Sequence, residues 1–336
     1  MMLYLCIATI GVLLWFEWVN GAADSGNAIA TVVVTEALPR RIAILLAVCM
    51  NMVGAFSGTA VAEMVGKGLI DRTFITLPSL FLATCIVIWW GLRAMKHGYP
   101  ISKSHAMFAG LGGVALADGG FDALIMSGWV YIFVGLVLSI IGSVVIGNLL
   151  GNLTNRCVNH SSMSIRKTDK LFRALQLVSA SVMAFSHGLN DAQKTMGLLM
   201  IVLIMSGEVP HDTPVLWWVI VLCAVVMGIG TACANMKTIH TIGDELGPVN
   251  PQQGFVAELV AGSVIMFFSW LHTPVSTSVI LTSSVAGTRC AERIADLDTL
   301  KFGEIMRAWV YTFLVVGGLT FVAEAVRLRI VDVFLW

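Results

Sequence analysis

The sequence has 336 residues, of which 57% are hydrophobic and only 12% are charged. A soluble domain carries roughly 25% charged residues, so a water-soluble fold of this size is excluded. Basic and acidic residues number 20 each, and the zero net charge argues against a nucleic-acid partner. A lipid bilayer is therefore the expected partner. With no net charge, only individual charged side chains near a binding site can act on a substrate.

Apolar runs long enough for membrane helices recur along the whole chain. A helix needs about 20 predominantly apolar residues to cross the hydrocarbon core. The runs predict an all-α, polytopic membrane protein. They cover residues 2–19, 42–65, 74–90, 129–150, 215–234 and 310–326.

A polar stretch interrupts the first apolar region at residues 20–28 (NGAADSGNA). Asp24, Asn27 and Thr31 follow i, i+3, i+7 spacing, which places them on one face of a helix expected to begin near Asp24. An ionisable group at the centre of a membrane helix costs at least ~2.5 kcal/mol, so we expect it to have a specific role. We predict a binding role for Asp24 and Asn27. A helix-capping role for Asp24 is the alternative.

A second polar patch lies at residues 100–104 (PISKS). Its hydroxyls, its backbone N–H groups and a proline at a helix start are typical of a helix N-terminus that receives an anion. Hydroxyls that merely bond to their own helix are the alternative. Ser102, Lys103 and Ser104 are the candidate binding residues here.

The long polar segment 152–172 separates two halves, 1–151 and 173–336, which we expect to be two transmembrane repeats. The segment contains Arg156, Arg166, Lys167 and Lys170. Short basic connections stay in the cytoplasm. Residues 152–172 are therefore predicted to be a cytoplasmic connecting loop.

Both polar patches recur in the second half, in the same order. Residues 185–191 (FSHGLND) align with 18–24 (WVNGAAD), and residues 274–278 (PVSTS) align with 100–104. Interrupted helices at corresponding positions of two repeats are typical of the midplane site of a transporter. The second-half candidates for substrate binding are Asn190, Asp191, Lys194, Ser276, Thr277 and Ser278.

These stretches resemble the phosphate inorganic transporter family, whose signature in each half is a Gly-x-Asn-Asp-like stretch. The resemblance spans nearly the whole chain and includes residues 254–258 (GFVAE). It implies two inverted repeats with broken helices and re-entrant hairpins, with about 10–12 membrane segments. It further implies a bacterial, low-affinity carrier of the plasma (inner) membrane that holds inorganic phosphate and a coupling cation between its halves. Ala23 departs from the family, which has Asn there.

The expected activity is secondary transport, because no Gly-x-x-x-x-Gly-Lys-Ser/Thr phosphate loop for ATP hydrolysis is present. We expect no cofactor. Asp24 and Asp191 can accept the proton of monohydrogen phosphate, which favours phosphate over sulfate. A sulfate permease of the same fold is the alternative, and the resemblance also implies a metal–phosphate complex as substrate. A membrane enzyme that uses His187 and Asp191 as an acid–base pair is a remote alternative, without a nucleophile to support it.

The coupling ion is expected to be a proton or sodium. Lys194 replaces Asn27 in the second half, and a sodium ion a few ångströms from it would be repelled by about 4 kcal/mol at an effective dielectric of 20. Sodium is thus expected only at Asp24 with Asn27. We favour a proton, with Asp24, Asp191 or Glu258 as acceptor and His187 as a relay, although His187 could instead be a packing residue. Assembly into a homo-oligomer stays open.

Overall fold

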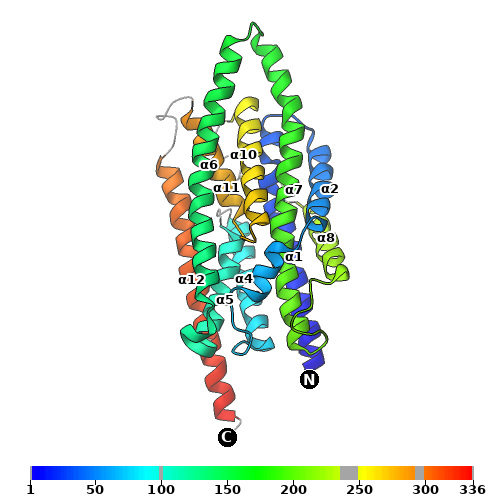
Figure 1. Ribbon diagram of the computed structural model, residues 1–336, viewed down its shortest axis with the longest axis vertical. Coiled ribbons are helices and arrows are strands. Elements are labelled where there is room, and N and C mark those ends of the chain that lie inside the picture. Colours follow the sequence, from blue (N-terminus) through cyan, green and yellow to red (C-terminus); the bar gives the residue numbers. More distant parts are fainter. Residues whose placement is uncertain (1, 98–100, 235–248, 292–298, 335–336) are drawn as a thin grey trace.

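The computed structural model describes residues 2–97, 101–234, 249–291 and 299–334, so Pro100 lies outside the described residues. Within these ranges the regular elements are helices, and the only β-type contact is an isolated bridge between Ile70 and Leu124. α1 (Met2–Val34) begins and α12 (Thr299–Phe334) ends at the same end of the molecule (Figure 1). The connection between α6 (Met126–His160) and α7 (Ile165–Met205) lies at the opposite end.

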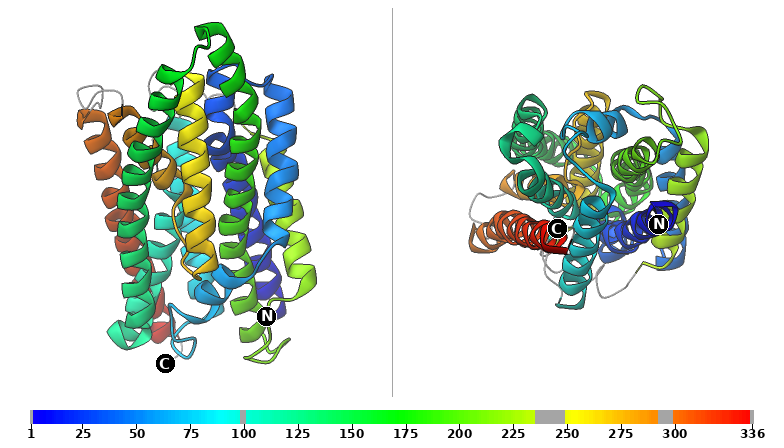
Figure 2. Two further views of the ribbon diagram at one scale, coloured as in Figure 1. Left: turned by 45° about the horizontal axis from the view of Figure 1, so that its top comes forward. Right: turned by 90° about the horizontal axis from the view of Figure 1, so that it is seen from below.

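Two helical hairpins lie between these long helices (Figures 1 and 2). One hairpin, α4 (Leu77–His97) with α5 (Lys103–Gly119), lies in the lower half of Figure 1, and the other, α10 (Pro251–Trp270) with α11 (Thr277–Cys290), lies in the upper half. Their tips meet, because Ser102 Oγ is 2.8 Å from Ser276 Oγ. The remaining helices are α2 (Arg40–Phe56), α3 (Ala60–Lys67), the short 3-10 helix η1 (Gly120–Ala123) and α8 (Trp217–Ala232).

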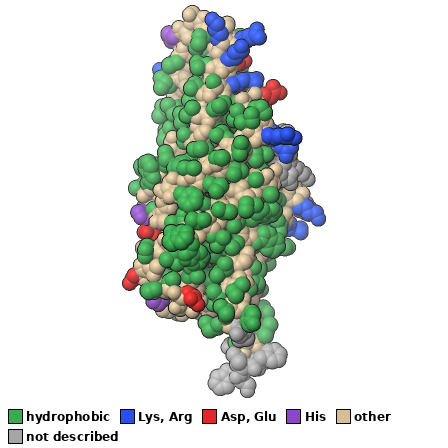
Figure 3. All heavy atoms as spheres, turned by 90° about the vertical axis from the view of Figure 1, so that its right-hand side faces the viewer, with side chains coloured by type: hydrophobic (Ala, Val, Ile, Leu, Met, Phe, Trp, Pro, Cys, Tyr) green, Lys and Arg blue, Asp and Glu red, His purple; other side chains and the backbone are tan. Residues whose placement is uncertain are grey.

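The helices have the length and apolarity of membrane spans, which confirms the predicted polytopic membrane fold. Among the described residues α1, α4, α6, α10 and most of α12 could each cross a bilayer alone. α2 and α3 together could form a sixth span that bends by 65°. Figure 3 shows hydrophobic side chains over the middle of one face, with Lys and Arg gathered toward the end that carries the α6–α7 connection.

The long helices cross at glycines that allow backbone to touch backbone. A Cβ atom on Gly188 of α7 would lie 2.0 Å from the carbonyl oxygen of Asn51 on α2. A Cβ on Gly21 of α1 would lie 2.5 Å from the carbonyl oxygen of Met227 on α8. Membrane helices pack closely where small residues lie at their crossings, because the hydrophobic effect does not drive helices together in lipid. α1 and α7 are thereby held deep inside the molecule.

The two signature stretches do not break their helices, contrary to the prediction. α1 is continuous from Met2 to Val34, so Asp24 lies in its interior and the expected helix start near Asp24 is wrong. Asp191 lies in the same way inside α7. The helix continues because backbone N–H and C=O groups in lipid need internal partners. The breaks instead lie at the hairpin tips, where Ser102 and Ser276 precede α5 and α11.

The expected loop at 152–172 is also wrong. α6 continues to His160 and α7 begins at Ile165, so only residues 161–164 connect the two helices. Both helices continue beyond the apolar runs, because Lys, Arg, Leu and Gln favour helix in water as well as in lipid. The cytoplasmic position of this connection, the division into repeats 1–151 and 173–336 and their inverted relation stay predictions.

Candidate functional site

α1 and α7 bring one group of polar residues to the middle of the molecule. Asp24 and Asn27 come from α1, and Asn190, Asp191 and Lys194 come from α7. All five are buried, with exposed fractions between 0% and 6%. A buried ionised side chain is tolerated only where another group compensates it, so the partners of these residues define the site.

The hairpin tips bring the second group. Ser102 is the N-cap of α5 and accepts a hydrogen bond from the backbone N–H of His105. Ser276 caps α11 in the same way and accepts from the N–H of Val279. Since the two cap hydroxyls are 2.8 Å apart, the N-termini of α5 and α11 meet at one point. The partial positive charges of two helix N-termini thus face each other, which favours an anion between them.

On the first-half side, Lys103 compensates Asp24. The Lys103 ammonium lies 2.6 Å from Asp24 Oδ1, and both side chains are almost fully buried. Asn27 Nδ2 lies 3.3 Å from the same Oδ1 and donates to Ser278 Oγ at 2.7 Å. The amide of Asn27 therefore links Asp24 to the tip of the other hairpin.

On the second-half side, Lys194 compensates Asp191 from within the same helix. The Lys194 ammonium donates to Asp191 Oδ1 at 2.5 Å, to the Val275 carbonyl at 2.7 Å and to Ser104 Oγ at 2.6 Å. Asn190 also donates to Asp191 Oδ1, at 2.6 Å, and the Thr277 hydroxyl donates to Oδ2 at 3.3 Å. Lys194 thus joins α7 to both hairpin tips.

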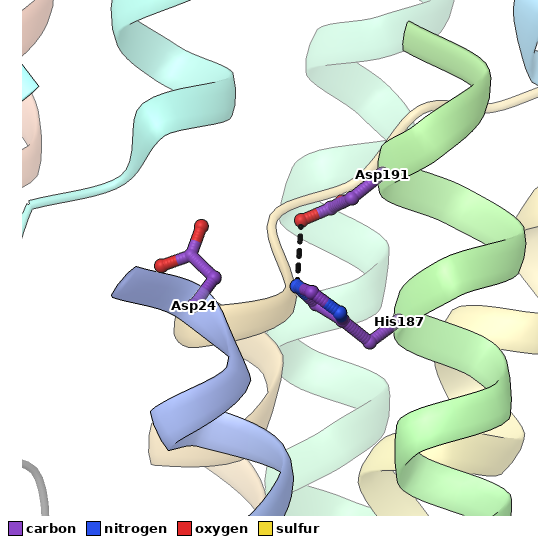
Figure 4. Close-up of side chains that lie close together, drawn as sticks. All are labelled: Asp24, His187 and Asp191. Carbon is purple, nitrogen blue, oxygen red and sulfur yellow. Dashed lines mark ion pairs between the residues drawn. The ribbon is translucent and has the colours of Figure 1, made fainter. Parts of the chain in front are cut away.

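His187 lies between this cluster and α2. Its Nε2 is 3.3 Å from Asp191 Oδ2, as the dashed line in Figure 4 marks, and its Nδ1 is 3.0 Å from Asn51 Oδ1. Figure 4 shows Asp24 on α1 beside His187 and Asp191 on α7. One ligand atom from each of these three lies within 4.8 Å of the others, which is compatible with a bound metal ion.

Glu258 is set apart from this cluster. It is fully buried on α10 and accepts hydrogen bonds from Thr31 of α1 and, at 2.5 Å, from Ser179 of α7. No lysine or arginine of the described residues forms an ion pair with it. The structure therefore brings together the predicted residues of α1, α7 and the hairpin tips, and it leaves Glu258 in a separate place along the same two helices.

Three participants were missed by the sequence analysis. Asn51 holds His187 and lies outside the repeated polar patches, whereas Val275 lies in the patch 274–278, where its backbone carbonyl accepts from both Lys194 and Asn190. Glu17, a fully buried carboxylate, contacts the Thr195 hydroxyl. A charged residue inside the run 2–19 was a usable sign for Glu17, whereas nothing in the sequence marks a backbone carbonyl.

Comparison with known proteins identifies the family. The profile described as "Phosphate transporter family" matches residues 20–320, which include Asp24, Asp191, Lys194 and both hairpin tips. The chain belongs to this family. It is accordingly a transporter and not an enzyme.

The curated relatives include bacterial proteins. A "Probable low-affinity inorganic phosphate transporter" of Bacillus subtilis is 34% identical over 313 residues, with 93% of each chain covered. A protein of the same description from Rhizobium meliloti is 35% identical, with 92% of each chain covered. These relatives and the apolar helices support a multi-pass protein of a bacterial plasma membrane.

A solved structure shares the fold. It is described as "The sodium-dependent phosphate transporter", superposes with a TM-score of 0.85 and is 17% identical. The match covers 98% of this chain and 99% of that one, so the likeness of fold extends to the whole helical arrangement.

Proposed function

We propose that this transporter carries inorganic phosphate across the membrane by cation symport, with the proton as the coupling ion. The observation that carries the proposal is the meeting of two helix N-termini, from α5 and α11, with the ammonium groups of Lys103 and Lys194. Backbone N–H groups, hydroxyls and lysines are ligands that a tetrahedral oxyanion prefers. The Bacillus subtilis and Rhizobium meliloti relatives are described as transporters of the same substrate.

Charge compensation supports symport. Lys103 offsets Asp24 and Lys194 offsets Asp191, so the residues of the centre carry little net charge when all four are ionised. A phosphate dianion would bring two negative charges into a region from which water is largely excluded. Uncompensated charge is expensive there. Cations that travel with phosphate would remove that penalty and would link transport to their gradient.

The lysines favour a proton over sodium. Each ammonium already occupies a position within 2.6 Å of its aspartate, where a sodium ion would otherwise bind. At a separation of a few ångströms, a sodium ion and an ammonium repel by about 4 kcal/mol at an effective dielectric of 20. We propose that Glu258, which has hydroxyl partners only, accepts the proton, and that His187, held by Asn51, relays a proton to or from Asp191.

A metal–phosphate complex is the second candidate substrate. Asp24, His187 and Asp191 offer three ligand atoms within 4.8 Å of one another, and carboxylate and imidazole are suitable ligands for divalent cations. If the complex is carried, removal of divalent cations with a chelator will lower phosphate uptake, and labelled metal will enter in proportion to phosphate.

Uptake of labelled phosphate into proteoliposomes tests the proposal. We expect an inward pH gradient without sodium to drive saturable uptake, and arsenate to compete far better than sulfate because it shares the protonation of phosphate. Equal competition by sulfate would favour the sulfate permease. If a sodium gradient at constant pH drives accumulation and collapse of the pH gradient changes nothing, proton coupling is wrong and Asp24 with Asn27 becomes the sodium site to examine.

A further inference from the structure

Glu17 is a buried carboxylate that the proposed transport mechanism has not yet used. It lies in the interior of α1 with an exposed fraction of 0%. One carboxylate oxygen accepts a hydrogen bond from the Thr195 hydroxyl on α7. The other, Oε1, is buried and has no hydrogen-bond partner among the described residues. An ionised carboxylate in this position is poorly compensated.

The charges around Glu17 do not supply a counterion. Asp191 and Lys194 of α7 act on it with opposite signs, and Lys194 is engaged by Asp191 at 2.5 Å. Cys223 is the titratable side chain that faces it from α8. On the other helices packed against α1, the titratable side chains are the buried Glu258 on α10, Cys49 on α2, Cys85 on α4, Cys290 on α11, and basic groups at or near helix ends: Arg40, Arg41, Arg93, Lys96, His97 and Arg289.

The four buried acids along α1, α7 and α10 thus fall into two classes. Asp24 and Asp191 each hold a lysine within 2.6 Å, so each can stay charged. Glu17 and Glu258 are fully buried and receive hydrogen bonds from hydroxyls alone. A hydroxyl can donate to a carboxylate or accept from a carboxylic acid. The second class is therefore suited to gaining and losing a proton without rearranging an ion pair.

Glu17 and Glu258 lie on opposite sides of the phosphate site. Glu17 precedes Asp24 by seven residues, which is about 10 Å along a helix, and Thr31, a donor to Glu258, follows Asp24 by seven. On α7, which runs in the opposite direction (Figure 1), Thr195 lies beyond Asp191 and Ser179 lies before it. Glu17 is thus on the side of the chain termini, and Glu258 is on the side of the α6–α7 connection.

From this arrangement we infer that Glu17 is a proton-carrying residue of the transport cycle, paired with Glu258 across the phosphate site. The inference rests on the proposed proton symport. A proton from the aqueous phase on the terminal side binds the Glu17 carboxylate, and the acid releases that proton toward the opposite side when the site changes its access. Thr195 is a positioning residue that holds the carboxylate toward α7.

Glu17→Gln in the full-length protein tests the inference, because glutamine keeps the volume and cannot titrate. In proteoliposomes with labelled phosphate and an internal pH dye, we expect pH-gradient-driven net uptake to fall at least tenfold and its proton influx with it. Phosphate–phosphate exchange at equal pH should persist, since exchange needs no net proton movement. Glu63→Gln, at an exposed acid of α3, is the matched control and should keep both activities.

The outcomes separate the two proposals. If wild-type uptake ignores the pH gradient, proton symport fails and the role of Glu17 fails with it. If wild type is proton-driven and Glu17→Gln keeps normal net uptake and the normal proton-to-phosphate ratio, only the inference about Glu17 is wrong. Loss of exchange together with net uptake in a folded Glu17→Gln protein would also overturn it, because the role would then be structural.

A second variant keeps the test valid if Glu17→Gln does not fold. Thr195→Val removes the hydroxyl and retains the carboxylate, so phosphate exchange should persist while the pH dependence of net uptake shifts. An unchanged pH profile in Thr195→Val would contradict the inference. Glu17→Asp, which can still titrate, should keep the wild-type proton-to-phosphate ratio at a lower rate.

Discussion

The two sides of the site hold the same kind of charge pair in different ways. On the second-half side, Asp191 and its lysine are three residues apart on α7, and Asn190, Thr277 and His187 also face the carboxylate. On the first-half side, Asp24 lies on α1 whereas Lys103 comes from the tip of the α4–α5 hairpin. A movement of that hairpin would separate Asp24 from Lys103, but no hairpin movement would separate Asp191 from Lys194. The difference indicates a fixed charge pair on one side and a separable one on the other.

Neutralising each aspartate is the strongest test of this difference. Asp24→Asn and Asp191→Asn should both reduce phosphate uptake by more than 100-fold, because each leaves a buried lysine uncompensated. Only Asp191→Asn should also lower the free energy of unfolding by about 3–5 kcal/mol, the usual effect of breaking a buried pair, since Lys103 can move with its hairpin. Uptake in proteoliposomes and thermal unfolding in detergent measure the two effects. Equal destabilisation by both variants would contradict the comparison.

Substitutions at the helix crossings that hold the two sides of the site should have the next largest effect, a loss of stability. Gly188→Ala would place a Cβ 2.0 Å from a backbone oxygen of α2, and Gly21→Ala would place one 2.5 Å from a backbone oxygen of α8. Overpacking against backbone costs about 1–3 kcal/mol or more, so both variants should unfold at lower temperature, with Gly188→Ala the more severe. Gly11→Ala, where nothing lies within 4 Å, is the matched control. An unchanged unfolding temperature for Gly188→Ala would show that α2 and α7 can separate freely.

Removal of the separable lysine should change the ion requirement. Lys103→Ala leaves Asp24 and Asn27 without the ammonium that lies 2.6 Å away, and a sodium ion could then occupy that place. We expect proton-driven uptake to fall and sodium at constant pH to stimulate uptake several-fold. Lys96→Ala, at an exposed lysine of α4, should behave as wild type. If sodium has no effect on Lys103→Ala, the ammonium is not a substitute for a bound cation.

The hydroxyls that join the two sides should have the smallest effects. Ser104 accepts from the charged Lys194 at 2.6 Å, whereas Ser278 accepts from the neutral Asn27 at 2.7 Å. A hydrogen bond to a charged group is worth about 1.5–3 kcal/mol and a neutral one about 1 kcal/mol. Ser104→Ala should therefore raise the KM for phosphate by about tenfold or more and Ser278→Ala by about fivefold. The reverse order in saturation kinetics would show that Lys194 does not depend on the first hairpin.

Much of the fold was accessible from the sequence because it depends on local composition. The apolar runs predicted membrane helices at α1, α4, α6 and α12, and the two Pro-x-Ser-x-Ser patches identified the hairpin tips that cap α5 and α11. The position of the helix breaks was less accessible. Gly and polar residues at 20–28 suggested a break, yet close packing against α8 and the need for internal backbone hydrogen bonds keep α1 continuous.

The sequence by itself determined that lipid surrounds this protein and where its two sets of polar patches lie. It also identified most side chains of the candidate site, since burial in lipid makes every charged residue conspicuous. Only the tertiary structure decided which charges neutralise one another. Lys103 meets Asp24, Ser102 meets Ser276 and Thr195 meets Glu17 across long sequence separations. Such pairs depend on how helices cross and on where hairpin tips end, which no local pattern encodes. For the same reason Glu17 could be recognised as a candidate proton carrier only after its lack of a counterion was visible.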